Sequence, residues 1–230
     1  MTGVQTCALP ISTEICSVAL SVDGVTQERV APGQQHSARI LSMIDELLAD
    51  AGWRLQQLDA LAFGRGPGLF TGLRIGTGVV QGLAFGAGLP VVPVSSLAAL
   101  AQGEAAAHVL AALDARMSQV YWGAYERDSD GTVALAGSEQ VLAPTEVPLP
   151  QTHEWVGVGS GWDHYAEALT ARLGPRLARW QGSCYPRARD VARLAAVGFE
   201  RGQAVTPEQA LPVYIRDEVA HKPARPEPPR

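Results

Sequence analysis

Five residues in the first half of the chain have the composition of a phosphate-binding loop. Gly64-Arg65-Gly66-Pro67-Gly68 separates an apolar run from a segment with helical character. Glycines at such a place let backbone amides approach an anion at a helix N-terminus, so Gly66 and Gly68 are candidate nucleotide contacts. No Lys-Ser/Thr pair follows, which excludes a Walker A loop. A tight turn from a strand into a helix, with its cap near Thr71, is the simpler interpretation.

A second set of candidates lies at the ends of two later apolar runs. Asp114 and Arg116 close the first of these runs. A carboxylate there could help to hold a nucleotide, although a hydrogen bond to its own turn is the simpler explanation. Gly159 lies in the glycine-rich stretch 157–161, which could also face a nucleotide. That stretch does not complete a G-x-G-x-x-G motif, because Trp162 takes the last place.

Ligands for a catalytic metal ion are sparse in the sequence. None of the five histidines forms an H-x-x-x-H pair or belongs to an H-E-x-x-H motif. No G-x-S-x-G elbow is present, and no cysteine has a histidine close to it in sequence. We therefore expect no metal site and no catalytic residue. Three widely spaced cysteines, Cys7, Cys16 and Cys184, fit a reducing compartment rather than a disulfide framework.

The elements that must position these residues alternate between strand and helix along the first half. Strands are predicted at 15–22, 25–30, 58–63 and 90–94, with Asp23-Gly24 as a hairpin turn. Helices are predicted at 35–51, 71–86 and 96–102. In the first helix the expected apolar stripe consists of Ile40, Leu41, Ile44, Leu47, Leu48 and Ala51. Such alternation after an initial hairpin predicts an α/β lobe around a mixed sheet.

The second half repeats this pattern. Strands are predicted at 108–114, 119–125, 132–141 and 155–159, and helices at 163–173 and 188–201. The order of strand, Asp-Gly turn and strand recurs at an offset of about 104 residues, which indicates a duplicated lobe. We expect one lobe at 1–104, completed by the C-terminal segment 205–230, and a second lobe at 105–204.

The predicted helix at 71–86 is unusual because it contains five glycines, at positions 72, 76, 78, 82 and 86. Each glycine in a helix costs roughly 1 kcal/mol relative to alanine. Spaced by four, they form a flat face that another helix can approach closely. We expect a glycine face to pack inward, while Leu73, Thr77, Val80 and Gln81 face a partner. Met43 lies outside the stripe of the helix at 35–51 and fits an adaptable surface contact.

Composition narrows the class of protein. The net charge is -5, so the chain alone is a poor nucleic-acid binder. Seven arginines between 172 and 201 could form an RNA-facing patch, although a solvated face is the simpler reading. No apolar run reaches the roughly 18 residues that span a membrane, and the start lacks a signal-peptide pattern. These features favour a cytoplasmic protein with no membrane contact.

A family resemblance rests on the stretch from Gly64 to Gly76, which reads GRGPGLFTGLRIG. It is similar to the GPGSFTGLRIG signature of the TsaB (YeaZ) family. The stretches STEICSVAL, QHSARILSMIDELL, VLAALDARMSQVYWGAY and PVYIRDEVAHK resemble the family too, so the likeness covers nearly the whole chain in order. Leu69 stands where the family has serine. Pro10 stands at the aspartate that ends the family's first strand, where it removes an amide that a central strand needs.

The start of the chain has a separate explanation. Residues 2–11 read like one frame of a sequencing-adapter oligonucleotide. We therefore expect residues 1–11 to replace the natural start of the protein, and we leave them out of the functional interpretation.

The resemblance implies an actin-like (ASKHA) fold of two RNase-H-like lobes with mixed sheets. It implies a non-catalytic subunit that binds and activates TsaD, which transfers a threonylcarbamoyl group to N6 of the adenosine next to the tRNA anticodon. TsaE is a further partner, a homodimer forms without TsaD, and tRNA is reached only through the complex. The subunit would have no cofactor of its own, with ATP, ADP or an adenylate held at the partner interface.

The expected partner interface lies on two helices. It consists of His36, Arg39, Ile40, Met43 and Leu47 on the first, and of Phe70, Leu73, Arg74, Thr77, Val80 and Gln81 on the second. Two other functions stay open. In active relatives of the actin-like fold, acidic residues at strand ends such as Asp114 hold a metal-nucleotide complex, so a stand-alone ATP-dependent phosphotransferase is one. A peptidase is the other, although no nucleophile or metal pair supports it.

Overall fold

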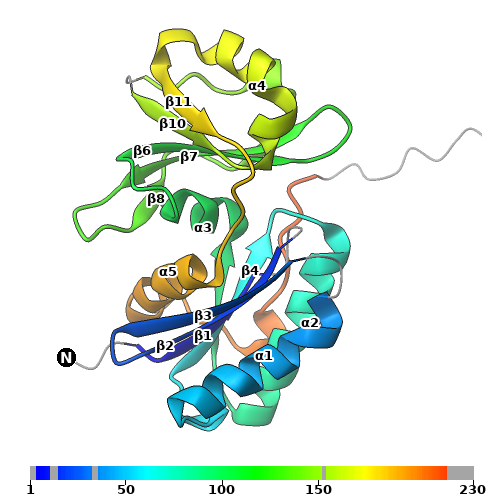
Figure 1. Cartoon of the computed structure of the whole chain (residues 1–230), viewed down its shortest axis with the longest axis vertical. Helices are drawn as coiled ribbons and strands as arrows, with labels where there is room; N and C mark the ends of the chain where they lie inside the picture. The colour runs from blue at the N-terminus through cyan, green and yellow to red at the C-terminus, as the bar shows by residue number, and fades with distance from the viewer. Residues whose placement is uncertain (1–3, 11–14, 33–35, 152–153, 217–230) are drawn as a thin grey trace, which may run out of the picture.

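The chain folds into two stacked α/β lobes (Figure 1). This computed structural model describes residues 4–10, 15–32, 36–151 and 154–216, and the side chains of residues 32–38 are outside the described part. Each lobe is built around one mixed sheet, and helices cover the faces of both sheets.

The first sheet has five strands in the order β3-β2-β1-β4-β5. They are β1 (Thr6–Leu9), β2 (Ile15–Val22), β3 (Val25–Pro32), β4 (Ala60–Gly66) and β5 (Val91–Ser95). The first three strands pair antiparallel, whereas β1, β4 and β5 run parallel. The Asp23-Gly24 turn predicted between β2 and β3 is confirmed, since both residues have positive φ.

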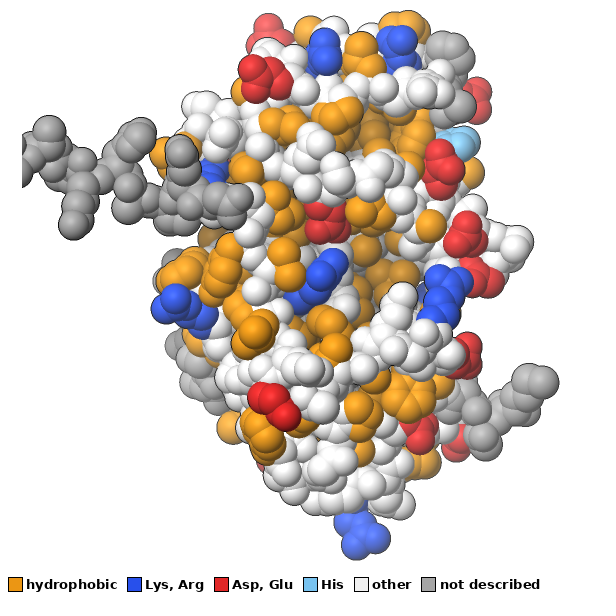
Figure 2. Space-filling model, turned by 180° about the vertical axis from the view of Figure 1, so that it is seen from behind, with side chains coloured by type: hydrophobic (Ala, Val, Ile, Leu, Met, Phe, Trp, Pro, Cys, Tyr) orange, Lys and Arg blue, Asp and Glu red, His pale blue; other side chains and the backbone are white. Residues whose placement is uncertain are grey.

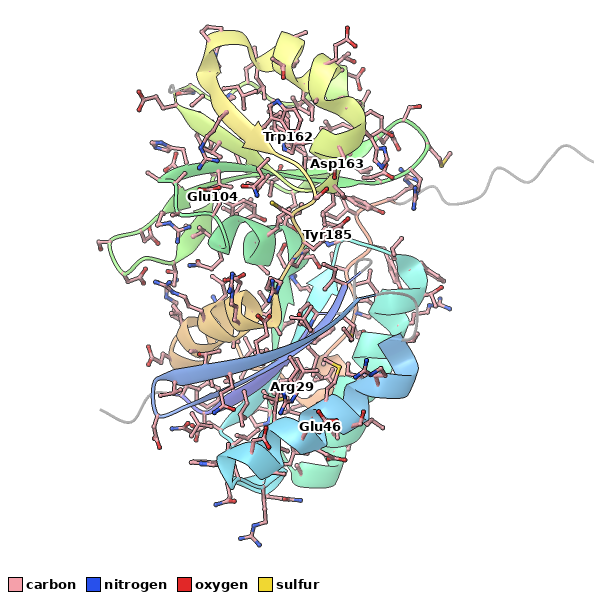
Figure 3. The ribbon with its side chains drawn as sticks, in the orientation of Figure 1. Arg29, Glu46, Glu104, Trp162, Asp163 and Tyr185 are labelled. Carbon is pink, nitrogen blue, oxygen red and sulfur yellow. The ribbon has the colours of Figure 1, made fainter. Side chains whose placement is uncertain are left out.

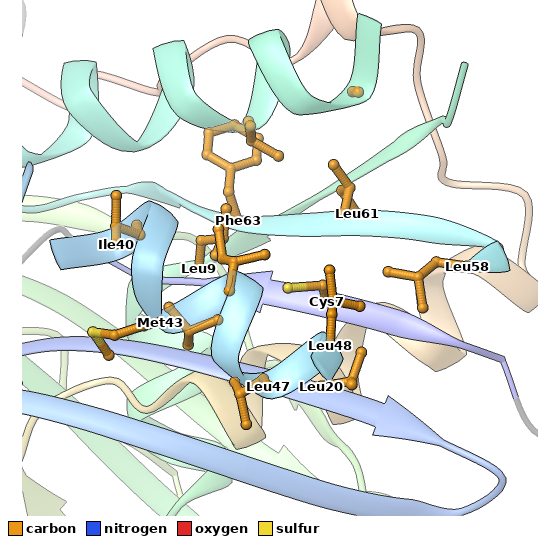
Figure 4. Close-up of a cluster of buried hydrophobic side chains, with 14 of the residues drawn as sticks. Cys7, Leu9, Leu20, Ile40, Met43, Leu47, Leu48, Leu58, Leu61 and Phe63 are labelled. Carbon is orange, nitrogen blue, oxygen red and sulfur yellow. The ribbon is translucent and has the colours of Figure 1, made fainter. Parts of the chain in front are cut away.

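Helices α1 (His36–Ala51) and α2 (Phe70–Ala87) cover one face of this sheet. Both are followed by a glycine in left-handed conformation, Gly52 after α1 and Gly88 after α2. Their apolar sides and the sheet enclose a core that includes Leu9, Phe63 and Ile40 (Figure 4). A 3₁₀ turn, η1 (Leu55–Gln57), joins α1 to β4.

The second sheet repeats the topology of the first. Its main path is β11-β10-β6-β7-β8, with β9 also paired to β7. The strands are β6 (His108–Asp114), β7 (Val120–Arg127), β8 (Val133–Leu135), β9 (Gln140–Leu142), β10 (Trp155–Val158) and β11 (Leu177–Gln181). β6, β7 and β8 form antiparallel hairpins, and β6, β10 and β11 are parallel. The five strands of its main path match the first sheet in order and direction, as the predicted duplication requires, and β9 is an addition.

Helix α4 (Ser160–Leu173) covers the outer face of the second sheet. It packs around Trp162, which is fully buried against Trp122 of β7. The 3₁₀ turns η2 (Pro144–Glu146) and η3 (Gly174–Arg176) lie beside α4. The long strand predicted at 132–141 is replaced by two short strands, β8 and β9, and the prediction missed β11 altogether.

The remaining two helices, α3 (Ser96–Gln102) and α5 (Ala188–Glu200), lie between the two sheets (Figure 1). α3 follows the last strand of the first sheet but packs Leu97 and Leu100 on the second sheet. α5 follows the second sheet but packs Val191 and Ala195 on the first. The boundary expected at 204 therefore differs from the packing, because α5 belongs with the first sheet.

The described part of the segment after α5, residues 201–216, also contacts the first lobe. Val205 bridges to Val91 of β5, and the amide of Val213 donates to the carbonyl of Arg65. The 3₁₀ turn η4 (Pro207–Gln209) lies against α2. Residues 217–230 are outside the described part of the chain.

A polar cluster joins the lobes beside α3. The Ser95 hydroxyl caps α3 by accepting from the amides of Leu97 and Ala98, and it also donates to the Glu139 carboxylate. The Tyr125 hydroxyl donates to the same carboxylate oxygen at 2.5 Å. Burial, and then the charge of Glu139, raise the pKa of Tyr125, so its hydroxyl stays a donor.

Residues 1–11, which we set aside, include the central strand of the first lobe. β1 lies between β2 and β4, and all four of its residues are buried. The strand ends at Leu9, so the ladder does not need an amide from Pro10.

Candidate functional site

Helix α2 has two contrasting sides. Leu73, Gly76, Thr77, Val80 and Ala84 form its buried side. They recur at the spacing of one helix face, and Val80 and Ala84 belong to the first-lobe core. The apolar side chains of α2 therefore stabilise its own lobe.

The opposite side of α2 presents glycines to the surface. Gly78, Gly82 and Gly86 are exposed, and a Cβ added at any of them would meet no other atom within 4 Å. The three follow one another at four-residue spacing, so they lie in one row along the helix. Because this row carries no side chains, another helix backbone can approach it closely. We call it the glycine row. Phe85, 62% exposed, stands beside its far end.

This arrangement corrects the predicted interface. Six of its residues are buried in this chain and have almost no surface to offer a partner, namely Ile40, Met43, Leu47, Leu73, Thr77 and Val80. Arg39, Phe70 and Arg74 are exposed as predicted. Gln81 is half-buried and donates to the carbonyl of Ala210, and the side chain of His36 is outside the described part.

The physical reason is the hydrophobic effect. A glycine row has no apolar side chain to remove from water, whereas burying a leucine or valine gains roughly 1.5–3 kcal/mol. The leucine and valine side of α2 therefore turns inward and the glycines turn outward, the reverse of our expectation. On α1 the same principle buries Met43 and leaves Leu41 50% exposed.

The outward face of α1 is acidic. Asp45, Glu46 and Asp50 are all exposed there. Arg29 of β3 forms an ion pair with Glu46, 3.3 Å from Nε to Oε2, and a second with Asp50. Figure 3 shows Arg29 and Glu46 pointing toward one another. Asp45 is left without an ion pair among the described residues, next to the exposed Leu41.

The loop that resembles a phosphate cradle is filled by the chain itself. Gly66 has φ +110°, and a Cβ there would lie 2.8 Å from the carbonyl oxygen of Val213. Likewise a Cβ on Gly159, φ +115°, would lie 2.2 Å from the carbonyl oxygen of Ala112. Both glycines thus allow close approach of the protein's own backbone. Neither lines the cavity that holds the other cleft candidates.

Asp114 makes the turn hydrogen bond that its position suggested. Its Oδ1 accepts from the amide of Arg116 at 2.9 Å and from the Tyr165 hydroxyl at 3.3 Å. Arg116 also pairs with Oδ2 at 3.2 Å. Asp114, Arg116 and Gly68 line one cavity of about 380 Å³ between the lobes, and most of its other lining residues are apolar.

Most of the remaining candidate residues, the arginines between 172 and 201 and the cysteines, interact within the chain or are buried in it. Four of the seven arginines between 172 and 201 form ion pairs, namely Arg179, Arg187, Arg189 and Arg201. Burial raises the pKa of the Cys7 thiol to about 12 and of the Cys16 thiol to about 11, so neither is a reactive thiolate.

The described residues contain no group of three or more histidine, cysteine, aspartate or glutamate side chains placed to hold a metal ion. None of the helices within these residues is long and apolar enough to cross a membrane.

Comparison with known proteins gives consistent likenesses. The family model described as "TsaD: tRNA N6-adenosine threonylcarbamoyltransferase" matches residues 21–223. The "tRNA threonylcarbamoyladenosine biosynthesis protein TsaB" of Escherichia coli is 42% identical, over 94% of this chain and 96% of that protein. The protein of the same name from Haemophilus influenzae is 41% identical, over 96% and 98%.

A solved structure shows the same likeness as the sequence comparisons. "YeaZ from Pseudomonas aeruginosa" superposes with a TM-score of 0.86 at 46% identity, covering 92% of this chain and 99% of that one. With the duplicated topology, these likenesses confirm an actin-like fold of two RNase-H-like lobes.

Proposed function

Because this chain belongs to the TsaB family, whose named relatives act in tRNA threonylcarbamoyladenosine biosynthesis, we propose that it is the partner subunit that binds and activates TsaD. In this role it does no chemistry itself. TsaD transfers the threonylcarbamoyl group to N6 of the adenosine next to the anticodon, and this chain holds TsaD in its active arrangement.

The observation that carries the proposal is the glycine row on α2. Three exposed glycines in one helix cost about 3 kcal/mol relative to alanine, and their own lobe gains no packing from them. Such a row is explained if another helix packs against it, since small residues let two backbones approach closely. A partner helix could also contact longer exposed side chains near the row, namely Leu41 of α1 and Arg74 and Phe85 of α2.

The charged residues on the outward face of α1 favour a specific partner over non-specific association. On the outward face of α1, Asp45 has no ion pair among the described residues and favours a basic counterpart on TsaD. Charges at the rim of an interface mainly set the rate and selectivity of association. We further propose TsaE as a member of the complex and tRNA as a ligand of the whole complex. ATP, ADP or an adenylate would be held where this chain meets TsaD, and without TsaD the same glycine row would pair two copies of this chain.

The test is a bulky substitution in the row. Gly82→Gln adds a side chain that points into open space, so the variant should fold and be as stable as the original protein or more stable. The same side chain holds a partner helix away. We expect TsaD binding, measured by calorimetry, to fall at least a hundredfold, and tRNA modification in a reconstituted assay to fall with it.

The matched control is Ala171→Gln on the exposed surface of α4, far from the row. It should leave both measurements unchanged. Undiminished TsaD binding by a folded Gly82→Gln variant would rule out the glycine row as the docking surface, and modification at full rate without this chain would remove its role in the reaction.

A further inference from the structure

Four of the exposed large apolar side chains gather at the cavity between the lobes. They are Leu69 and Phe70 at the start of α2, Met117 in the turn between β6 and β7, and Tyr214 in the C-terminal segment. Their exposed fractions run from 42% for Leu69 to 78% for Met117. We call these four residues the bridging patch. Figure 2 shows hydrophobic side chains exposed on both lobes around the level at which the lobes meet.

The bridging patch is continuous with the face of α2 that carries the glycine row. The guanidinium of Arg74 lies over the ring of Phe70 at 3.9 Å, and its Nε donates to the Tyr214 hydroxyl at 3.5 Å. Phe70 and Tyr214 are themselves in ring contact, with centroids 5.5 Å apart. Arg74 and Gly78 are one helical turn apart on the exposed side of α2. A partner helix lying on the glycine row therefore reaches the patch without a gap.

The patch also extends onto the second lobe. Arg116, Met117 and Ser118 are three successive residues with positive φ, a conformation that costs non-glycine residues free energy. In this turn Met117 is 78% exposed, and its Sδ accepts from Nη1 of Arg216 at 3.1 Å. Arg216 ties the C-terminal segment to it by donating to the carbonyl of Ala115 and to the Gln119 side chain.

From this continuity we infer that TsaD docks on both lobes, by placing apolar side chains against the bridging patch while its helix lies on the glycine row. The inference rests on the proposed function for the identity of the partner. Its consequence is that docking fixes the separation of the two lobes, because one rigid partner then touches α2 and the β6–β7 turn together. An exposed methionine suits such a contact, since its side chain adapts to the shape opposite.

Met117→Glu is the decisive variant, because Met117 belongs to the second lobe and lies outside α1 and α2. A carboxylate in an apolar contact must lose its hydration, so TsaD affinity should fall on the order of tenfold or more. Met117→Leu keeps the apolar contact and should restore binding. The control is Leu135→Glu on β8, which is 42% exposed and outside the patch, and it should bind like the original protein.

Hydrogen exchange gives a second measurement that does not depend on substitution. Amides of Ala115 to Gln119 should exchange more slowly when TsaD is bound. If Met117→Glu binds like Leu135→Glu and these amides are unaffected, the bridging contact does not exist. In that case a Gly82→Gln variant that still loses binding leaves the proposed function standing. If Gly82→Gln also binds normally, the glycine row is not the docking surface either, and the proposed function itself fails only if tRNA modification proceeds at full rate without this chain.

Discussion

At the scale of single residues, Asp190 is the carboxylate least suited to its surroundings. It lies in the first turn of α5 and is 9% exposed. Its nearest cation is Arg189, with Nε at 3.9 Å, and no other described side chain bonds its carboxylate. Burial raises its pKa to about 6, the charge of Glu28 adds to the rise, and Arg189, Arg187 and Arg193 oppose it.

Asp190→Asn tests this interpretation. Because the pKa is raised on folding, the folded chain keeps a proton between pH 4 and 6 that the unfolded chain releases. The resulting stability is complete below about pH 4 and is lost as the pH rises through 6. Asparagine has the uncharged shape, so at pH 7.5 the variant should be more stable by up to about 3 kcal/mol.

The measurement is urea unfolding at several pH values. The gain from Asp190→Asn should shrink toward zero as the pH falls to 4.5. Asp128→Asn, a substitution at an exposed acid, serves as the control and should show little change across this range. A variant less stable than the original at pH 7.5 would mean that the ionised carboxylate stabilises the start of α5, as a charge at a helix N-terminus can.

At the scale of elements, two glycines differ in whether the surrounding structure leaves room for a side chain. At Gly78 a Cβ would meet nothing, whereas at Gly157 of β10 it would lie 2.2 Å from the ring of Trp162. Trp162 is fully buried and stacks on Trp180, with ring centroids 6.1 Å apart, so its ring is packed on more than one side. Gly78→Ala should therefore stabilise the protein by up to about 1 kcal/mol.

Gly157→Ala should instead destabilise by roughly 1–3 kcal/mol or more, because an overpacked core must distort. Thermal unfolding of the two variants beside the original protein gives the comparison. A lower melting temperature for Gly78→Ala would show that α2 is constrained there by a contact we have not recognised, and an unchanged one for Gly157→Ala would show that Trp162 has another place to go.

Sequence patterns predicted the elements better than the faces they present. α1 and α2 begin and end within one or two residues of the prediction, because long apolar periodicity and terminal glycines are strong local signals. The predicted stripe of α1 is buried at Ile40, Ile44, Leu47 and Leu48, but Leu41 is 50% exposed and Met43, placed outside the stripe, is buried. The spacing Ile40, Met43, Ile44, Leu47 was the better guide, since it follows the helical repeat.

Other parts were beyond reach for physical reasons. β11 was missed because its five residues are mostly exposed and show no alternation of apolar and polar types. The role of Gly66 and Gly159 depends on backbone that approaches from 147 and 47 residues away in the chain, at Val213 and Ala112. Residues Met117 and Tyr214 of the bridging patch gave no signal, because single apolar residues in loops are common and only the fold brings them together.

At the scale of the whole molecule, the lobes share their helices. α3 connects to the first sheet and packs on the second, and α5 does the reverse. If one lobe unfolds, its sheet no longer covers the apolar side of the helix supplied by the other lobe. Unfolding of either lobe therefore exposes apolar side chains of both. We therefore expect the described chain to unfold in one cooperative step.

Two probes can check this cooperativity. Four of the five tryptophans lie in the second lobe, so fluorescence reports mainly on that lobe, while circular dichroism reports on both. Their urea transitions should coincide. Leu97→Ala in α3 should shift both midpoints together, with a loss of about 2–5 kcal/mol. Separate midpoints for the two signals would show that the lobes unfold independently.

The crossed helices also limit how the gene for such a protein can be divided. A cut in the chain between α3 and β6 would give a first fragment that ends in α3 but lacks the second sheet, on which Leu97 and Leu100 pack. The second fragment would contain α5 but lack the first sheet, on which Val191 and Ala195 pack. Each fragment would expose apolar side chains to water and would tend to aggregate. Although the two halves repeat one topology, we therefore expect neither half to fold stably when it is produced without the other.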